Sequence, residues 1–111
     1  MYCARESERN IIMGHRAGFC GCKTENDIFI GHCSGYCQRG SFGNVYIGNE
    51  AGRCATKNNV VIGNSAGKCV SQAHNTFIGD HAGTKATEAC GNTFLGKYSG
   101  ACNTTGNRNT N

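Results

Sequence analysis

The chain has 111 residues, with no proline or tryptophan and as many as 17 glycines. Only 38% of the residues are hydrophobic, which is little for one central core in a compact globule of this length. The formal charge of +4 is spread thinly, without a run of lysine or arginine, which argues against nucleic-acid binding. No apolar stretch has the length of a transmembrane helix, and residues 1–10 lack the apolar centre of a signal peptide.

One motif of nine residues, typified by Asn75-Thr-Phe-Ile-Gly79-Asp-His-Ala-Gly83, occurs six times. Its copies begin at residues 10, 27, 44, 59, 75 and 92, so the period is 15–17 residues. All variation in length falls in the return segment that leads to the next copy. A fixed period is the signature of a solenoid, in which each coil buries its apolar face against the next coil. We predict a single repeat domain over residues 1–111, with partial repeats at both ends.

The apolar part of each motif predicts a β-strand, because three β-branched, aliphatic or aromatic residues closed by glycine are too few for a helix. In chain order the strands are expected in the Asn-x-apolar-apolar-Gly segments of the copies that begin at residues 10, 27, 44, 59, 75 and 92. A short second strand is expected after the second glycine, as in Gly18-Phe-Cys-Gly-Cys22. The fold class is therefore all-β, a parallel β-solenoid or β-roll of about six coils.

Two apolar columns run through the expected strands on opposite faces, because alternate strand residues point in opposite directions. The third motif position reads Ile12, Phe29, Tyr46, Val61, Phe77 and Phe94. The fourth position reads Met13, Ile30, Ile47, Ile62, Ile78 and Leu95. One face can line the interior of the coil, and the other then needs a partner. We expect the third-position column to be an oligomer face or a core face, and we favour oligomer contact, since a bare aromatic stripe marks an interaction surface.

Polar and glycine columns frame each strand. The leading position reads Asn10, Asp27, Asn44, Asn59, Asn75 and Asn92. Stacked in register, these side chains predict an amide ladder along the axis. The two glycines of each motif suit corners with positive φ or a crowded backbone.

Nine cysteines occur, and six of them share one position of the repeat. This cysteine column comprises Cys3, Cys20, Cys37, Cys54, Cys69 and Cys102, with Lys85 as its only interruption; Cys22, Cys33 and Cys90 lie outside it. Three interpretations are open: inward-pointing apolar thiols, disulfides between neighbouring coils or chains, and metal ligands. A coil spacing of ~4.8 Å lies within the Cα separation of about 4.4–6.8 Å that disulfides allow.

No pattern indicates catalysis. Carboxylates never recur as a pair in register, and a nucleophile built from Cys33 with His15 or His32 would lack a third, orienting group. The two histidines share a column that elsewhere holds Asn49, Asn64, Asp80 and Lys97. We therefore interpret them as exposed polar corner residues, and we expect no catalytic residue, no cofactor and no metal.

The motif Asn-Thr-Phe-Ile-Gly-x-x-Ala-Gly resembles the repeats in the stalks and shafts of phage tail fibres and related virion fibres. It is also similar to the head repeats of trimeric autotransporter adhesins, which share an Asn-x-x-x-Ile-Gly core. The resemblance covers residues 10–102 and departs from those repeats in the cysteine content. It implies parallel β-coils, homotrimers and an elongated shape.

These features predict a structural fibre- or filament-forming protein, extracellular or on a cell surface or virion. Its expected partner is itself, in a homo-oligomer that is most simply a trimer, with end-to-end polymerisation and without nucleic acid or membrane insertion. One alternative is an adhesin that binds a glycan or cell-surface receptor through return segments such as residues 23–26 and 71–74. A remote alternative is an ice-binding solenoid, although the second strand position has threonine only at Thr76 and Thr93.

Overall fold

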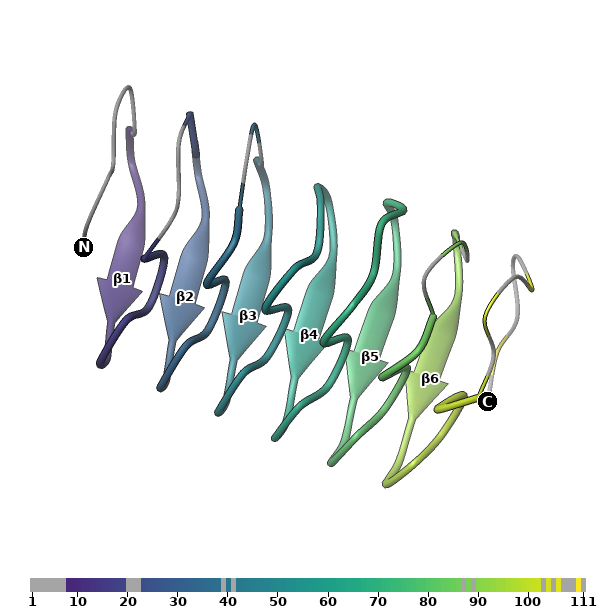
Figure 1. Ribbon diagram of the computed structural model, residues 1–111. Coiled ribbons are helices and arrows are strands. Elements are labelled where there is room, and N and C mark those ends of the chain that lie inside the picture. The colour runs from purple at the N-terminus through teal and green to yellow at the C-terminus, as the bar shows by residue number, and fades with distance from the viewer. Residues whose placement is uncertain are drawn as a thin grey trace.

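The computed structural model describes residues 8–19, 23–38, 40, 42–86, 88, 90–102, 104, 106 and 110. In these residues, six strands form one parallel sheet whose order follows the sequence (Figure 1). The strands are β1 (Ile11–Met13), β2 (Ile28–Ile30), β3 (Val45–Ile47), β4 (Val60–Ile62), β5 (Thr76–Ile78) and β6 (Thr93–Leu95). Together with their connections they form a β-solenoid of about five turns. The predicted parallel β-solenoid is therefore confirmed, with about five turns between its six strands.

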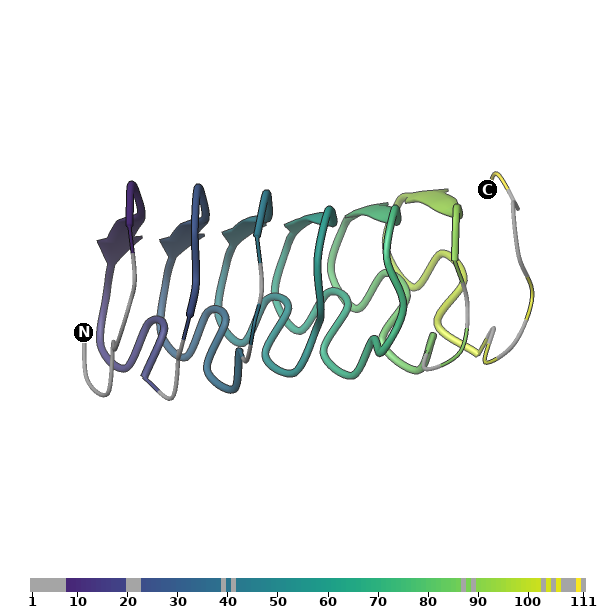
Figure 2. The same cartoon turned by 90° about the horizontal axis from the view of Figure 1, so that it is seen from above.

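The coils stack along one axis into a body of 35 × 20 × 16 Å (Figure 2). Every strand residue pairs with the residue at the same motif position in the next coil, as Phe29 does with Tyr46 and Tyr46 with Val61. The connection between β3 and β4 is the shortest in the chain, and the register across it is unchanged. The return segments therefore absorb all differences in coil length, while the strands keep a constant frame.

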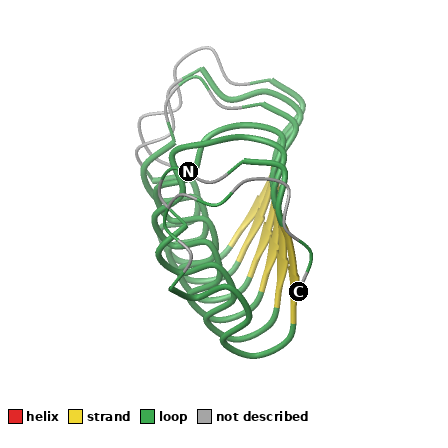
Figure 3. Ribbon diagram, turned by 90° about the vertical axis from the view of Figure 1, so that its right-hand side faces the viewer, coloured by secondary structure: helices red, strands yellow, loops and turns green. Residues whose placement is uncertain are grey.

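Each coil has a single strand where its backbone is described, so the expectation of a second strand is wrong there (Figure 3). Residues 32–37 and 49–54 form turns instead. The cause is a pair of left-handed residues in each coil, such as Cys33 at φ 56° and Gly35 at φ 59°. Two left-handed residues within three curl the chain and prevent an extended strand. The coils still bond to one another here, since the N–H of Gly35 donates to the carbonyl of Ala51 over 3.0 Å.

The third-position column fills the interior of the solenoid. Its members from Phe29 to Phe94 are fully buried, and Ile12 is partly buried at one end. The rings stack coil on coil, with centroids 5.3 Å apart for Phe29 and Tyr46 and 5.0 Å apart for Phe77 and Phe94. The preference for this column as the oligomer face is therefore wrong.

The corner opposite the strands explains why the rings point inward. A Cβ atom placed on Gly52 would lie 2.5 Å from the ring of Tyr46, so the second glycine of the motif makes room for the aromatic side chain. The neighbouring small side chains, Ala51 and Ala66, are fully buried beside the rings. A corner built from glycine and a small residue leaves enough space in so narrow a coil for a ring.

The first glycine of the motif allows neighbouring coils to approach. Gly48 has φ 135°, and a Cβ atom there would lie 2.5 Å from the carbonyl oxygen of Gly63 on the next coil. Gly96 has a similar φ of 122°, but an added Cβ would meet nothing within 4 Å. The two positions share the same backbone strain and differ in the contact with a neighbouring coil.

Replacing each of these two glycines by alanine distinguishes the energetic cost of backbone strain from the cost of a steric overlap with the next coil. We expect Gly96→Ala to lower the free energy of unfolding by about 1–3 kcal/mol through backbone strain alone. We expect Gly48→Ala to cost roughly 1–3 kcal/mol more, because its methyl group overlaps the backbone of the next coil. Urea unfolding followed by circular dichroism measures both. Equal losses for the two variants would contradict the close approach of the coils.

Candidate assembly surfaces

The outer face of the sheet is an aliphatic surface, which we call the aliphatic face. Its first column consists of Ile11, Ile28, Val45, Val60, Thr76 and Thr93. Its second column consists of Met13, Ile30, Ile47, Ile62, Ile78 and Leu95. All but the two threonines are apolar, and none is charged. The members at its two ends are the most open, with Met13 60% and Leu95 66% exposed.

The Asn/Asp column forms a buried ladder, but its bonds differ from the expected amide-to-amide stacking. From Asn10 to Asn75, the side-chain oxygen instead accepts the backbone N–H of the corresponding residue in the next coil. The bonds join Asn10 to Asp27 and Asp27 to Asn44 over 2.8 Å, Asn44 to Asn59 over 3.0 Å, Asn59 to Asn75 over 2.9 Å, and Asn75 to Asn92 over 3.0 Å. The ladder thus ties all six coils together at one corner.

The amide nitrogens of the same column hold the return segments in place. The Nδ2 group of Asn44 donates to the carbonyl of Thr56 over 2.7 Å, and that of Asn92 donates to the carbonyl of Gly106 over 2.8 Å. Both ends of the Asn44 side chain therefore have intramolecular partners, which is the condition for burying an amide at low cost. The column serves the fold, and its buried polar atoms face no solvent.

The histidine column is a chain of surface hydrogen bonds. The ring of His15 stacks on that of His32 at 5.2 Å, and the Nδ1 atom of His32 lies 3.1 Å from the Oδ1 atom of Asn49. Asn49 then donates to Asn64 over 2.9 Å, and Asn64 donates to Asp80 over 3.1 Å. The donation from Asn64 holds the pKa of the Asp80 carboxyl below its ordinary value.

This column offers no metal cage in the described part of the chain. No group of three or more histidine, cysteine, aspartate or glutamate side chains there is placed to hold a metal ion. The nearest approach is the Sγ atom of Cys33, 3.7 Å from the Nε2 atom of His32. Cys33 is buried, and the nearby carboxylate of Glu50 is bonded to Lys68, so the geometry of the pair stops short of a nucleophile with an activated base.

The cysteine column points outward where it is described. Cys37, Cys54, Cys69 and Cys102 are exposed free thiols, while Cys3, Cys20 and Cys22 lie outside the described residues. The interpretation of the column as inward-pointing thiols is therefore wrong for these four. The left-handed residue two positions earlier, such as Gly35 before Cys37, turns the chain so that the cysteine faces solvent.

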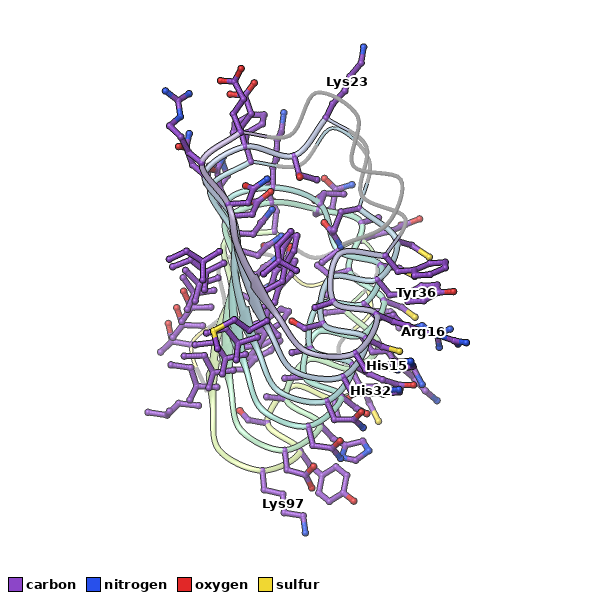
Figure 4. The ribbon with its side chains drawn as sticks, turned by 90° about the vertical axis from the view of Figure 1, so that its left-hand side faces the viewer. His15, Arg16, Lys23, His32, Tyr36 and Lys97 are labelled. Carbon is purple, nitrogen blue, oxygen red and sulfur yellow. The ribbon has the colours of Figure 1, made fainter. Side chains whose placement is uncertain are left out.

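Beside the thiols lies an aromatic and basic cluster that the sequence analysis missed. Phe19 and Tyr36 stack at 5.2 Å, Arg53 lies over the ring of Tyr36, and Arg16 lies over that of Phe19. Figure 4 shows Arg16, Tyr36, His15 and His32 on one side of the solenoid. The sequence does contain a signal for this cluster, because an aromatic residue immediately precedes the column cysteine in two adjacent coils, at Phe19 and at Tyr36.

No known protein family, no curated protein and no solved structure matches this chain. Among the described residues, none forms a helix with the length and apolar character needed to cross a membrane. Function must therefore be argued from the ladders and surfaces of the solenoid itself.

The Asn ladder can be tested with two asparagines of one coil. We expect Asn59→Ala to lower the free energy of unfolding by about 1–3 kcal/mol, because it removes the buried acceptor of the Asn75 N–H. Asn64→Ala breaks only exposed hydrogen bonds, and we expect a loss within about 0.5 kcal/mol. Thermal and urea unfolding give both values. A larger loss for Asn64→Ala would contradict the assigned roles.

A second test concerns the ion pair between neighbouring coils at Glu50, whose carboxylate lies 2.9 Å from the Lys68 ammonium group. The hydrogen bond from Lys68 is the main cause that lowers the pKa of Glu50 below its ordinary value of 4.5. A carboxyl with a lowered folded pKa stabilises the fold above its unfolded pKa, and this contribution is lost as the pH falls through the folded pKa.

We expect wild type to exceed Glu50→Gln in stability at pH 7, by no more than about 1 kcal/mol for so accessible a pair. The difference should disappear in acid, once Glu50 is protonated in both the folded and unfolded chains. Urea unfolding at a series of pH values measures it. A difference that persists unchanged at the acid end would show that the ion pair is not its source.

Proposed function

We propose that this protein is a structural repeat protein that associates with copies of itself through the aliphatic face to form a fibre or filament shaft. The observation that carries this proposal is the aliphatic face: six strands in register present only uncharged, mostly branched aliphatic side chains to the outside. Contiguous apolar surface of this kind is a feature of interaction sites.

A second copy is the partner that fits this face best. The side chains repeat at the same spacing on every copy, so two such faces are complementary without a special fit at any one position. Stacked sheets pack face to face at about 10 Å, a distance that short branched side chains such as Val45 and Ile47 fill well. No charge on either face would be buried by the contact, so desolvation would be inexpensive.

A trimer is the oligomer that we propose. Three solenoids whose sheets face a common axis would remove all three aliphatic faces from water and leave the return segments and the thiols outside. The motif's resemblance to the repeats of trimeric fibres and adhesins supports this choice. The extracellular, cell-surface or virion location remains part of the same proposal and rests on the resemblance alone.

The interior is suited to a rigid shaft. The Asn ladder and the parallel strand pairing each run through successive coils without a break in register. An ice-binding function would use the same outer face, but only Thr76 and Thr93 supply hydroxyl groups there. The composition of the face therefore favours apolar contact with protein.

Sedimentation velocity in a reducing buffer tests the proposal, because the reductant removes any disulfide between protomers. We expect wild type to associate with increasing concentration, and Ile47→Lys to weaken association at least tenfold by placing a charge at the centre of the face. The matched control is Gln72→Lys, which adds the same charge to an exposed return segment. We expect that variant to associate like wild type.

Circular dichroism must show the same strand signal in all three proteins. Wild type that stays monomeric at the highest soluble concentration would overturn the proposal. Equal association of wild type and Ile47→Lys would also overturn it, because the contact would then lie elsewhere. Negative-stain electron microscopy of the associated species distinguishes fibres from closed trimers.

A further inference from the structure

The described part of the cysteine column contains three exposed thiols on consecutive coils: Cys37, Cys54 and Cys69. Backbone hydrogen bonds fix their order, since the N–H of Cys37 donates to Arg53 over 2.7 Å and that of Cys54 donates to Lys68 over 3.0 Å. Each cysteine therefore lies beside the cysteine of the next coil. We call these three residues the thiol ladder.

We propose that the thiol ladder is a single oxidation site, in which a disulfide between neighbouring coils always includes Cys54 and moves between Cys37 and Cys69. Neighbouring coils are ~4.8 Å apart, which lies inside the Cα separation that a disulfide allows. Cys37 and Cys69 are two coils apart, roughly 9.6 Å, which exceeds the limit of about 7 Å. Cys54 is thus the shared member, and the two possible disulfides exclude each other.

The oxidant can be a low-molecular-weight disulfide such as oxidised glutathione. The thiolate of one ladder cysteine attacks it, forms a mixed disulfide and releases one glutathione. The neighbouring ladder cysteine then attacks the protein sulfur of the mixed disulfide and releases the second glutathione. Two electrons pass from the two cysteines to the glutathione disulfide, and the two thiol protons end on the two glutathione molecules.

The remaining ladder thiol allows the disulfide to move. In a protein with Cys37 and Cys54 bonded, the thiolate of Cys69 attacks the Sγ atom of Cys54, the old S–S bond breaks, and Cys37 leaves as a thiolate that takes up a proton. The three sulfur-bearing positions lie in a row along the solenoid axis, which suits such an in-line displacement. The reverse step follows the same path with Cys37 as the attacking residue.

The environment of Cys54 supports its central role. The Cys54 side chain is open to solvent on one side only; partial loss of water around its sulfur, followed by the neighbouring thiols of Cys37 and Cys69, raises the pKa of Cys54 to about 11. The first attack on glutathione disulfide therefore falls to an outer thiol, and Cys54 acts second, on the mixed disulfide held beside it in the next coil. Each disulfide within the ladder leaves one of its three thiols reduced.

Because of Lys85, the reactivity of the Cys69 thiol depends on one neighbouring cysteine of the column, Cys54. Lys85 occupies the cysteine position in the coil after Cys69, so Cys54 is the only cysteine next to Cys69 in the column. The reaction takes place within one protomer. It is therefore independent of assembly, and the failure of either proposal leaves the other intact.

The test treats dilute full-length protein with oxidised glutathione, blocks the remaining thiols with N-ethylmaleimide and maps tryptic peptides by mass spectrometry. Cys54 and Cys69 fall in different peptides, residues 54–57 and 69–85, and Cys37 falls in residues 24–39. We expect wild type to yield both linkages of Cys54, Cys69→Ser to yield only the linkage to Cys37, and Cys37→Ser only the linkage to Cys69. Mixing unlabelled with ¹⁵N-labelled protein separates intramolecular linkages from those between protomers, because mixed-isotope pairs arise only between protomers.

Cys54→Ser is the decisive variant. We expect Cys69 to be at least tenfold more alkylated in Cys54→Ser than in wild type, since it has lost its neighbour. Adding Lys85→Cys to Cys54→Ser gives Cys69 a new neighbour and should restore its protection. Circular dichroism confirms that each variant keeps its strands.

Three results would overturn the proposal. The first is a linkage between Cys37 and Cys69 within one protomer. The second is a Cys69 that is equally alkylated in wild type and in Cys54→Ser. The third is a wild-type protein in which only one linkage of Cys54 ever forms, because the disulfide would then not move.

Discussion

The structure depends on one constraint: each coil lies directly over the next without any shift in register. The bond from each leading Asn or Asp side chain to the backbone N–H of the next coil enforces this alignment from inside the solenoid. A slip of one residue would turn every strand side chain to the opposite face and would leave the buried amides without their partners. The first glycine of each motif permits the alignment, because its missing side chain lets two backbones meet.

Alignment gathers the residues of each motif position into a column along the solenoid axis. Aromatic rings stack on aromatic rings inside, aliphatic side chains line the outer face of the sheet, and thiols follow one another along another corner. Figure 4 shows Tyr36, the residue before Cys37, on the side away from the strands. Assembly through the aliphatic face and oxidation of the thiol ladder would therefore use separate surfaces of the same protein.

The repeat alone was sufficient to predict the strands and their parallel order, because the length of the motif is constant and its apolar run is always closed by glycine. The choice of the inner column was missed, since alternation shows that Tyr46 and Ile47 face opposite ways but does not say which one faces inward. The Ala-Gly corner decides it, because only the aromatic side chain reaches the space that Gly52 leaves open. The outward direction of Cys37 depends on the left-handed backbone at Cys33 and Gly35, and Cys33 belongs to a residue type that rarely adopts it.

Amide hydrogen exchange by NMR tests the central constraint most directly. The backbone amides of Asp27, Asn44, Asn59, Asn75 and Asn92 donate to side-chain oxygens inside the solenoid. We expect these amides to exchange as slowly as the strand amides of Val45 and Val60, whose acceptors are backbone carbonyls. Exchange of the leading-residue amides at the rate of exposed, unbonded amides would contradict the buried ladder, and with it the register on which every surface of the molecule depends.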